Sequence, residues 1–567
     1  MERNVRHLEL EAPRSGRPKE RTARRARGLA LTAAAAIALG GLARPAAGAA
    51  PDRSAGEPTK APGVPATPLP PVRTFEISEF RVEGATVLSA VEVEGVVSPF
   101  LGPGRALEDV EKARAALEKA YSDRGFQTVT VAIPPQTVRD GVVTLRVTEG
   151  KVGRLRVLGA RYFSPSDIKE QAPSMAEGTV PNFNGIVRDI AVLNQLPDRR
   201  VSPQLHAGAV PGTVDVDLNV QDSLPLHGSL ELNNRYSPNT TPLRLNGAIR
   251  YDNLWQAAHT LGFAFQIAPQ NLSDAEVYSL YYLARFWGVT WFTLTASGVV
   301  QNSDVSTLGG SAVTGRGRIF GVHGNFTLPS SSGFFQTISA GLDLKHFGEG
   351  LTLGGSTIDT PITYTPVTAQ YTAVWQGDSS QTTVSGTAVF DLRGLSSGSS
   401  AFDAKRYGAS GSFIYWRADF SRTDTFEPLQ LAARASGQYS SVPLVSPEQF
   451  TAGGADSVRG YLEVQAAGDF GVTGSVEVRS PSLLALFGRS VPDDWRFYAF
   501  TDAGWLGLVD ALAGQTSRFA LWGAGGGTRA RVLGHLAAMV EVGVPLTTVG
   551  TTQRYQPHVY FQVLGDF

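Results

Sequence analysis

Two short motifs in the C-terminal part of the chain combine residue types that form ion pairs in confined spaces. The first motif consists of Val458, Arg459, Gly460 and Tyr461, and the second consists of Phe500, Asp502 and Gly504. Arginine offers a rigid fork of donors, a buried arginine needs a carboxylate, and glycine lets the backbone turn tightly. We expect Arg459 to pair with Asp502. The alternative is an exposed loop arginine and an aspartate with other partners.

The sequence favours no other chemistry. The chain contains no cysteine, which excludes thiolate ligands and thiol nucleophiles. We find no G-x-S-x-G elbow on a strand–turn–helix and no closely spaced cluster of histidines or carboxylates. The first fifty residues carry a net charge of +6, which leaves about −7 for the rest of a chain whose total is −1, and this excludes a basic nucleic-acid binder. We therefore predict no enzyme activity, no cofactor, no metal and no nucleic-acid partner.

Residues 224–567 alternate between apolar and polar side chains with a period of two. In the last stretch, Val559, Phe561 and Val563 alternate with His558 and Tyr560. These stretches run for about ten residues, whereas strands of soluble proteins average about five or six. Long strands with one apolar face are typical of a transmembrane β-barrel, and they are compatible with a mean hydropathy of −0.06.

We count sixteen such strands, an even number, as bacterial single-chain barrels have. The predicted strand starts lie near Leu226, Leu243, His259, Ala275, Thr290, Arg316, Phe334, Pro361, Gln381, Arg406, Leu429, Phe470, Trp495, Phe519, Leu536 and Pro557. The terminal Phe567 ends an amphipathic strand. We expect it to be the signal by which an outer-membrane barrel is offered to the assembly machinery.

The strand pattern also positions the two motifs. The longest structured interruption, residues 441–469, separates the eleventh strand from the twelfth and contains the first motif. If the chain enters the barrel from the periplasm, this connection is the sixth external loop. Alternation along the thirteenth strand turns Phe500, Asp502 and Gly504 toward the polar interior. We expect the loop to fold inward, so that Arg459 reaches Asp502.

Residues 74–150 and 151–223 repeat one pattern of elements. The strand that ends at Gly84-Ala85 returns as the strand that ends at Gly159-Ala160. A short helix follows in each copy, then a longer amphipathic helix (residues 107–123 and 182–196), and two alternating strands close the copy. The predicted unit is β-α-α-β-β, present twice.

The N-terminal residues predict export from the cytoplasm. An apolar run over residues 28–42 follows the basic residues Arg21, Arg24, Arg25 and Arg27. We predict a secretory signal peptide over residues 1–49 and an extended, proline-rich linker over residues 50–73. A twin-arginine signal is the disfavoured alternative, because the residues after the arginine pair do not fit it.

These features together resemble the two-partner secretion outer-membrane transporters of the haemolysin secretion/activation type (TpsB; ShlB/FhaC/HecB), which belong to the POTRA–β-barrel assembly superfamily. The resemblance rests on the two motifs and the doubled unit. In the first unit, residues 124–126, 133–136, 140–141 and 149–150 read Arg-Gly-Phe, Ile-Pro-Pro-Gln, Asp-Gly and Glu-Gly, as POTRA domains of that family do.

The resemblance implies a sixteen-stranded outer-membrane barrel preceded by two periplasmic POTRA domains. The POTRA domains would recognise a secreted exoprotein, encoded nearby, and the barrel would translocate it to the cell surface by type V secretion. The resemblance also implies that Arg459 contacts Asp502 inside the barrel and that loss of the loop tip impairs secretion. Outer-membrane lipid and the barrel-assembly machinery are the other expected partners.

Two other functions are weighed against secretion. An assembly or insertion factor of the same superfamily would use the same loop motif, but such factors generally carry more POTRA units. A passive porin has no need of POTRA domains. Family members also carry, in some cases, a plug helix before the first POTRA domain, but residues 51–73 show no amphipathic helix.

Overall fold

The computed structural model describes residues 74–567, except residues 287, 304, 307–312, 315, 349, 354–355 and 487–493. The predicted signal peptide (1–49) and linker (50–73) lie outside the described residues, and so does the segment in which a plug helix was sought. Among the helices of the described part, none is both long and apolar enough to cross a membrane.

The first N-terminal unit is a small α/β domain. Its strands are β1 (Phe75–Ile77), β2 (Glu79–Glu83), β3 (Gly102–Arg105), β4 (Val129–Ala132) and β5 (Val142–Glu149), and its helices are α1 (Ala90–Val97), the 3-10 turn η1 (Ser98–Phe100) and α2 (Leu107–Asp123). The main sheet has the order β2-β5-β4, and β1 pairs with β3. In α2, Val110, Leu117 and Tyr121 are buried on one face, as their three- and four-residue spacing predicts.

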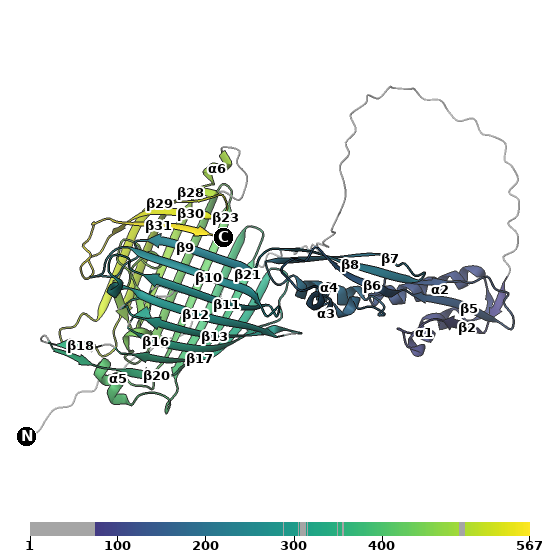
Figure 1. The fold of residues 1–567 in the computed structure, drawn as a ribbon, viewed down its shortest axis with the longest axis horizontal. Coiled ribbons are helices and arrows are strands. Elements are labelled where there is room, and N and C mark those ends of the chain that lie inside the picture. Colours follow the sequence, from purple (N-terminus) through teal and green to yellow (C-terminus); the bar gives the residue numbers. More distant parts are fainter. Residues whose placement is uncertain are drawn as a thin grey trace, which may run out of the picture. The chain divides into compact units, whose positions relative to one another are not determined.

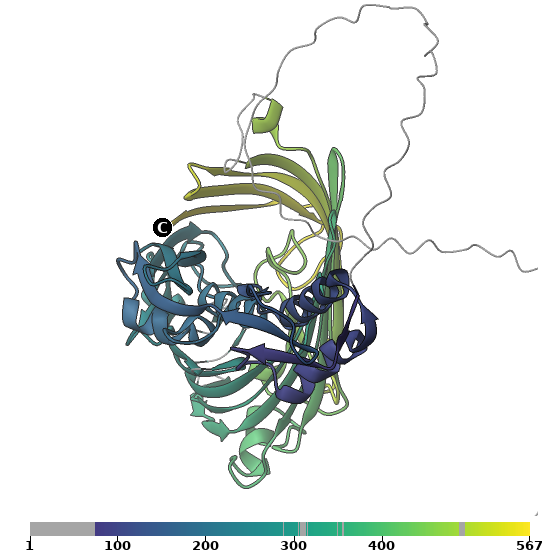
Figure 2. The ribbon, with the colours of Figure 1, turned by 90° about the vertical axis from the view of Figure 1, so that its right-hand side faces the viewer.

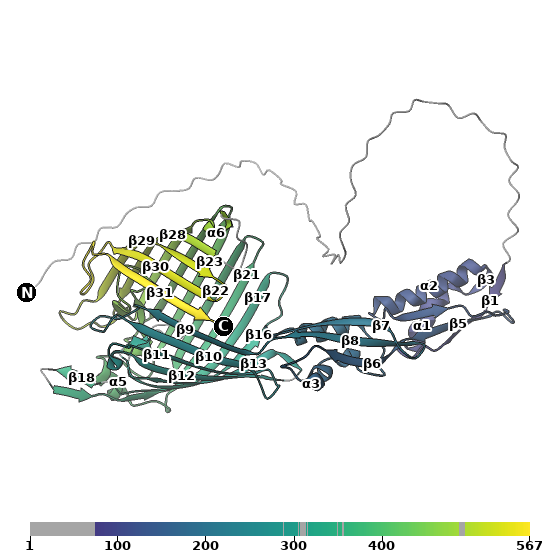
Figure 3. The ribbon, with the colours of Figure 1, turned by 45° about the horizontal axis from the view of Figure 1, so that its top comes forward.

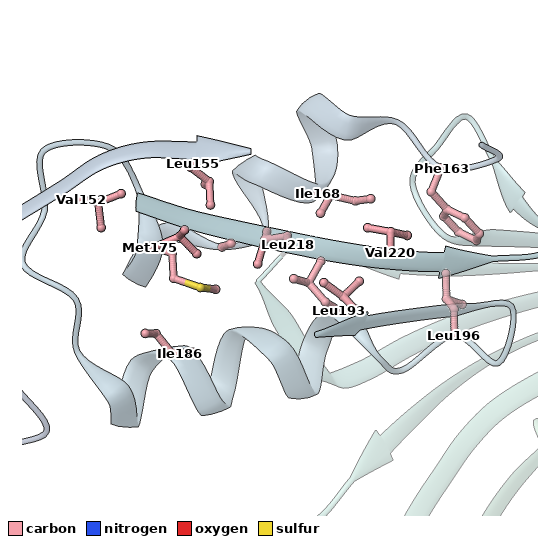
Figure 4. Close-up of a cluster of buried hydrophobic side chains, with 13 residues drawn as sticks. Val152, Leu155, Phe163, Ile168, Met175, Ile186, Leu193, Leu196, Leu218 and Val220 are labelled. Atoms are coloured by element: carbon pink, nitrogen blue, oxygen red, sulfur yellow. The ribbon is translucent and has the colours of Figure 1, made fainter. Parts of the chain in front are cut away.

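The second unit repeats this arrangement. Its elements are β6 (Lys151–Leu158), α3 (Pro165–Glu170), the 3-10 turn η2 (Pro173–Met175), α4 (Phe183–Leu193), β7 (Arg199–Ala207) and β8 (Thr213–Asp222). The sheet order is β6-β8-β7, with β6 and β8 parallel. Figure 4 shows the core of this unit, in which Ile168, Leu193 and Leu218 come from two helices and a strand and belong to one buried cluster. The second unit has the order β-α-α-β-β, and the first unit has the same order with the additional pair β1 and β3, of which β3 lies between the two helices.

The rest of the chain closes into an antiparallel barrel (Figure 1). Its strands are β9 (Leu226–Asn233), β10 (Arg244–Leu254), β11 (His259–Ile267), β12 (Glu276–Phe286), β13 (Val289–Gln301), β16 (Gly317–Thr327), β17 (Phe334–Phe347), β20 (Ile362–Tyr364), β21 (Pro366–Gln376), β22 (Ser380–Asp391), β23 (Ile414–Phe426), β24 (Leu429–Ser440), β27 (Phe470–Arg479), β28 (Asp494–Gly507), β29 (Arg518–Val532), β30 (Leu536–Pro545) and β31 (His558–Asp566). Both β20 and β21 pair with β17, so they are two parts of one strand. The described residues thus form sixteen barrel strands, which confirms the prediction.

Shorter elements lie in the connections. They are β14 (Val305–Ser306), β15 (Val313–Thr314), β18 (Gly350–Leu353), β19 (Ser356–Asp359), β25 (Phe450–Ala452), β26 (Ala466–Gly468), α5 (Ser399–Lys405), α6 (Leu483–Leu486), and the 3-10 turns η3 (Leu272–Asp274) and η4 (Ser446–Glu448). In Figure 2 the barrel strands form a ring seen nearly end-on.

Side chains of β28 alternate between the two faces of the barrel wall. Phe497 and Trp505 are 49% and 44% exposed on the outside. Phe500 and Asp502 are buried on the inside. The face predicted from alternation is therefore confirmed, and Asp502 lies inside the barrel.

One predicted strand start is wrong. The tenth barrel strand, β23, begins at Ile414 and not near Arg406. Residues before Ile414 form α5 and a return segment, whose Phe402 and Phe413 pack in a buried aromatic cluster with Tyr364. Arg406 does not begin a barrel strand. Its guanidinium forms an ion pair with the buried carboxylate of Asp469.

Candidate functional site inside the barrel

The segment between β24 and β27, residues 441–469, folds into the barrel as a hairpin. Its strands β25 and β26 pair with each other, and they pack against β28 of the wall. Gly453 and Gly454 both adopt positive φ angles, 110° and 103°, where the chain turns toward the tip. We call residues 441–469 the inserted loop and residues 458–461 its tip.

The tip carries Arg459 to Asp502. The Nε of Arg459 donates to Oδ2 of Asp502 at 2.7 Å, and Nη2 donates to Oδ1 at 2.9 Å. The backbone N–H of Arg459 donates to the same carboxylate at 3.0 Å. Arg459 is 2% exposed and Asp502 is 1% exposed. The structure therefore brings the two motifs together in a bidentate, buried ion pair of the kind that gives strong and specific contacts.

The remaining donors of Arg459 bind residues that sequence reasoning missed. Nη1 donates to Glu477 at 2.7 Å and lies 3.5 Å from Glu541, and Nη2 donates to the hydroxyl of Ser475 at 3.1 Å. These partners lie on β27 and β30, the neighbours of β28 and β29 in the wall. Cross-strand proximity of this kind depends on register, which alternation alone does not supply.

Glu477 is shared by three arginines. Besides Arg459, it accepts hydrogen bonds from Arg479 at 2.7 Å and from Arg529 at 2.6 Å. Glu541 accepts a further hydrogen bond from the hydroxyl of Tyr498 at 2.9 Å. A buried charge is tolerated when it is paired and hydrogen-bonded, and each charge of this group meets that condition.

The other predicted motif residues also contact one another or the wall. The hydroxyl of Tyr461 lies 2.7 Å from the hydroxyl of Thr547 and donates to its carbonyl at 2.8 Å. The ring of Phe500 lies under the guanidinium of Arg459. A Cβ atom on Gly504 would stand 3.1 Å from Cγ2 of Val458, so glycine leaves the space that Val458 needs.

Glycines in the wall strands that follow β28 leave room for the tip. A Cβ atom on Gly523 of β29 would stand 1.9 Å from the carbonyl oxygen of Arg459, and one on Gly543 of β30 would stand 2.5 Å from the nitrogen of Gly460. Gly460 itself has a φ of 102°. The signal for these positions was present in the sequence, because glycines gather at 523 and 525–527 of a strand that otherwise alternates.

A G-x-S-x-G pattern does occur after a strand and before a helix, contrary to the sequence prediction. Gly394-Leu395-Ser396-Ser397-Gly398 follows β22 and precedes α5. The hydroxyl of Ser396 donates to Oδ1 of Asp391 at 2.9 Å and accepts the N–H of Thr365 at 3.1 Å. In the part of the chain that the structure describes, no histidine hydrogen-bonds to this serine. We interpret Ser396 as a residue that stabilises the turn through its hydrogen bonds.

Folding also gathers residues that sequence spacing could not group. Asp198, His227 and Asp252 place ligand-type atoms within 4.8 Å of one another. Nε2 of His227 lies 3.0 Å from Asp198, and Arg250 donates to Asp252 at 2.9 Å. These contacts are those of an ion-pair cluster, and we assign no metal to it.

Comparison with known proteins identifies the family. The family model described as "Haemolysin secretion/activation protein ShlB/FhaC/HecB" matches residues 212–530, which is more than half of the chain. The chain belongs to this family. A second model, "POTRA domain, ShlB-type", matches residues 75–150, so the first N-terminal unit is a POTRA domain.

Individual relatives agree with the family. Outer membrane transporter CdiB of Escherichia coli O6:K15:H31 (strain 536 / UPEC) is 25% identical over 515 residues, which are 87% of this chain and 82% of that protein. The solved structure of CdiB from Escherichia coli aligns with a TM-score of 0.58 at 21% identity, over 89% of this chain and 93% of that one. BamA from Haemophilus ducreyi lacking POTRA domains 1–3 aligns with a TM-score of 0.52 at 14% identity, over 87% and 100%.

These findings establish the class of the protein. It is an outer-membrane β-barrel transporter of two-partner secretion, with its POTRA domain in the periplasm. Its partner is accordingly a secreted exoprotein. The likeness to the BamA structure extends to the fold alone.

Proposed function

We propose that export of the exoprotein depends on the inserted loop and on the contact that Arg459 makes with Asp502. The proposed translocation residues are Val458, Arg459, Gly460 and Tyr461 on the tip and Phe500, Asp502 and Gly504 on the wall. The observation that carries the proposal is the burial of the arginine among three carboxylates inside the barrel. A loop held in this way has one defined resting position in the path of the client.

The lumen beside the tip supports this reading. A cavity of about 370 Å³ remains there, lined by wall residues such as Arg434, Asp494 and Met539. An exoprotein segment that enters the barrel from the periplasm meets the tip and its charge cluster. Passage then requires the loop to shift, and the ion pairs set how readily it does so and how reliably it returns.

Recognition of the client is proposed for the two periplasmic units. We interpret residues 151–223 as a second POTRA domain, because their elements follow the order of the first unit. Strand β4 in one sheet and β7 in the other lie at sheet edges. An exposed edge can bind an extended client by adding a strand, with the backbone supplying the hydrogen bonds.

Insertion of the transporter is proposed to use its final strand. Phe567 exchanges two backbone hydrogen bonds with Gly228, the N–H donating at 3.0 Å and the carbonyl accepting at 3.2 Å, and its side chain is largely exposed. An exposed terminal aromatic on an amphipathic strand suits capture by the barrel-assembly machinery. The outward apolar face of the strands then contacts outer-membrane lipid.

The test compares export by Arg459→Ala with export by Arg434→Ala. The side chain of Arg434 lines the same cavity but makes no ion pair or hydrogen bond with any described residue, which makes Arg434 a matched control. The client is defined as the large surface or released protein that is lost when the transporter gene is deleted. We expect Arg459→Ala to insert in the outer membrane and to lose most export, while Arg434→Ala exports normally.

Normal export by an inserted Arg459→Ala variant would refute the proposed role. The same deletion strain separates secretion from the assembly function. If deletion lowers the level of many outer-membrane barrels and no exoprotein disappears, the protein is an assembly factor.

A further inference from the structure

The barrel closes at an incomplete strand pairing. Strand β31 pairs with β9 from Gln562 opposite Asn233 to Asp566 opposite Ser229. The first residues of β31, 558–561, lie beyond the end of β9. Figure 3 shows the two strands, yellow and teal, side by side where the sheet meets itself. We call the pairing of β9 with β31 the seam.

The inserted loop bonds to the β9 side of the seam. Immediately after β9, Nε of Arg235 donates to Oε1 of Glu463 at 3.1 Å, and its other nitrogen pairs with Asp456. The N–H of Glu463 donates to the carbonyl of Tyr236 at 3.0 Å. Glu463 fits because Gly454 opposite has no side chain: a Cβ there would stand 2.1 Å from the Glu463 carboxylate.

The same loop bonds to the β31 side of the seam. The hydroxyl of Tyr560 accepts the N–H of Gly460 at 2.8 Å and donates to the carbonyl of Tyr461 at 2.6 Å. Tyr560 is buried and points into the barrel from β31. One tyrosine hydroxyl therefore satisfies two backbone groups of the tip.

Between these two attachments, the side chain of Asn234 links the end of β9 to β31. The amide nitrogen of Asn234 donates to the carbonyl of Val559 at 2.7 Å, and its amide oxygen accepts the N–H of Phe561 at 2.8 Å. Asn234 thus continues the ladder for one step where β9 has already ended. Arg235 follows it directly, so the loop attachment and the end of the ladder lie at one place.

We infer that the inserted loop is a staple that holds the seam closed, with Arg235 and Tyr560 as its positioning residues. The loop contacts β31 and the residues that directly follow β9, where the pairing of the two strands ends. Withdrawal of the loop removes the Arg235 and Tyr560 contacts together. Loop position and seam closure are therefore coupled. This role goes beyond export, since it concerns the barrel with no client present.

The test measures how the folded barrel resists heat in detergent. On gels, a folded barrel migrates differently from the unfolded chain, so the midpoint of conversion is read from a temperature series. Tyr560→Phe removes only the hydroxyl, and Arg235→Gln replaces the guanidinium with a shorter, neutral amide, so each variant removes its contact with the loop. We expect each to lower the midpoint by about 2–4 °C or more, whereas Arg434→Gln leaves it unchanged.

A disulfide across the seam tests whether the Arg235 and Tyr560 contacts stabilise the barrel by holding the seam closed. The chain has no native cysteine, and Leu232 and Val563 face each other across the seam, at a separation typical of paired strands and suitable for a disulfide. In oxidised Leu232→Cys/Val563→Cys protein, we expect Arg235→Gln and Tyr560→Phe to lose their effect on the midpoint, and reduction to restore it. Equal destabilisation in the locked and reduced barrels would overturn the staple, as would unchanged midpoints in the unlocked variants. Neither result bears on whether the protein exports a client.

Discussion

The guanidinium carbon of Arg459 lies 3.4 Å from the centroid of the Phe500 ring. The ring covers one face of the planar group, while its edge is taken up by Asp502, Glu477 and Ser475. A flat cation with several donors in one plane fits this site, and a compact ammonium group does not. The geometry therefore distinguishes arginine from lysine at equal charge.

Arg459→Lys is expected to lose most export despite keeping the positive charge. Lysine cannot form the bidentate contact with Asp502 and reach Glu477 at the same time, so buried carboxylates are left with incomplete partners. The measurement is the amount of client outside the cell, with Arg434→Lys as the control. Export at the wild-type level by Arg459→Lys would show that charge alone suffices.

Gly523→Ala is expected to keep the tip out of its resting position. The added methyl group would stand 1.9 Å from the carbonyl oxygen of Arg459, a backbone atom that cannot move independently of the tip. The reporter is a cysteine introduced at Ser457, beside the tip, whose reaction rate with an external maleimide rises when the tip is displaced. Gly386→Ala is the matched control, because a Cβ at that strand position meets nothing within 4 Å. Equal labelling rates in both variants would contradict the assigned geometry.

Glu477→Gln is expected to destabilise the inserted loop by more than the loss of one ion pair would, because one carboxylate serves three arginines. Glu477 binds Arg459, Arg479 and Arg529 together, and removal of one member of a buried ion pair costs about 3–5 kcal/mol. Hydrogen exchange of residues 453–461 reports the loosening. Unchanged protection of that segment would mean that Glu477 does not contribute to holding the tip.

The stability of the POTRA domain should depend on the ionisation of Glu149. Burial raises the pKa of Glu149, but hydrogen bonds from Thr86, Val87 and Tyr121 outweigh it and lower the pKa below its ordinary value of 4.5. A group whose pKa is lower in the folded state stabilises the fold above its unfolded pKa, and this stabilisation is lost as pH falls through the folded pKa. In the full chain, the protection factors of amides within residues 75–150, corrected for the intrinsic exchange rate at each pH, should therefore decrease as the pH falls below 4.5.

Glu149→Gln provides the matching variant for that experiment. It should weaken protection at neutral pH, because the neutral amide accepts weaker hydrogen bonds than the carboxylate. It should also remove this group's share of the acid dependence. An acid response of the same size in Glu149→Gln would assign the effect to other groups.

The sequence predicted much of the barrel because alternation and turns are local signals. Strand starts at Leu226, His259, Phe334, Leu429, Phe470 and Leu536 coincide with the structure. The start near Arg406 was wrong because a loop that packs on itself, through Phe402 and Phe413, is hydrophobic without being a strand. A local pattern does not distinguish these two uses of apolar residues.

The candidate site was predictable in its two central residues and not in their surroundings. Arg459 could be matched with Asp502 because a buried arginine needs a carboxylate, and alternation placed Asp502 on the inner face of the barrel wall. Glu477 and Glu541 could not be found, because their approach depends on the register of four wall strands. Arg235 and Tyr560 come from opposite ends of the barrel sequence, and only closure of the sheet brings them to the same loop.

The most direct test is a double-mutant cycle on export. Arg459→Ala, Asp502→Asn and the double variant are compared with the wild type at equal levels in the outer membrane. If the buried contact is what export requires, each single variant loses most export and the double variant loses no more than the worse single one. Losses that multiply, or normal export by either inserted single variant, would contradict the account.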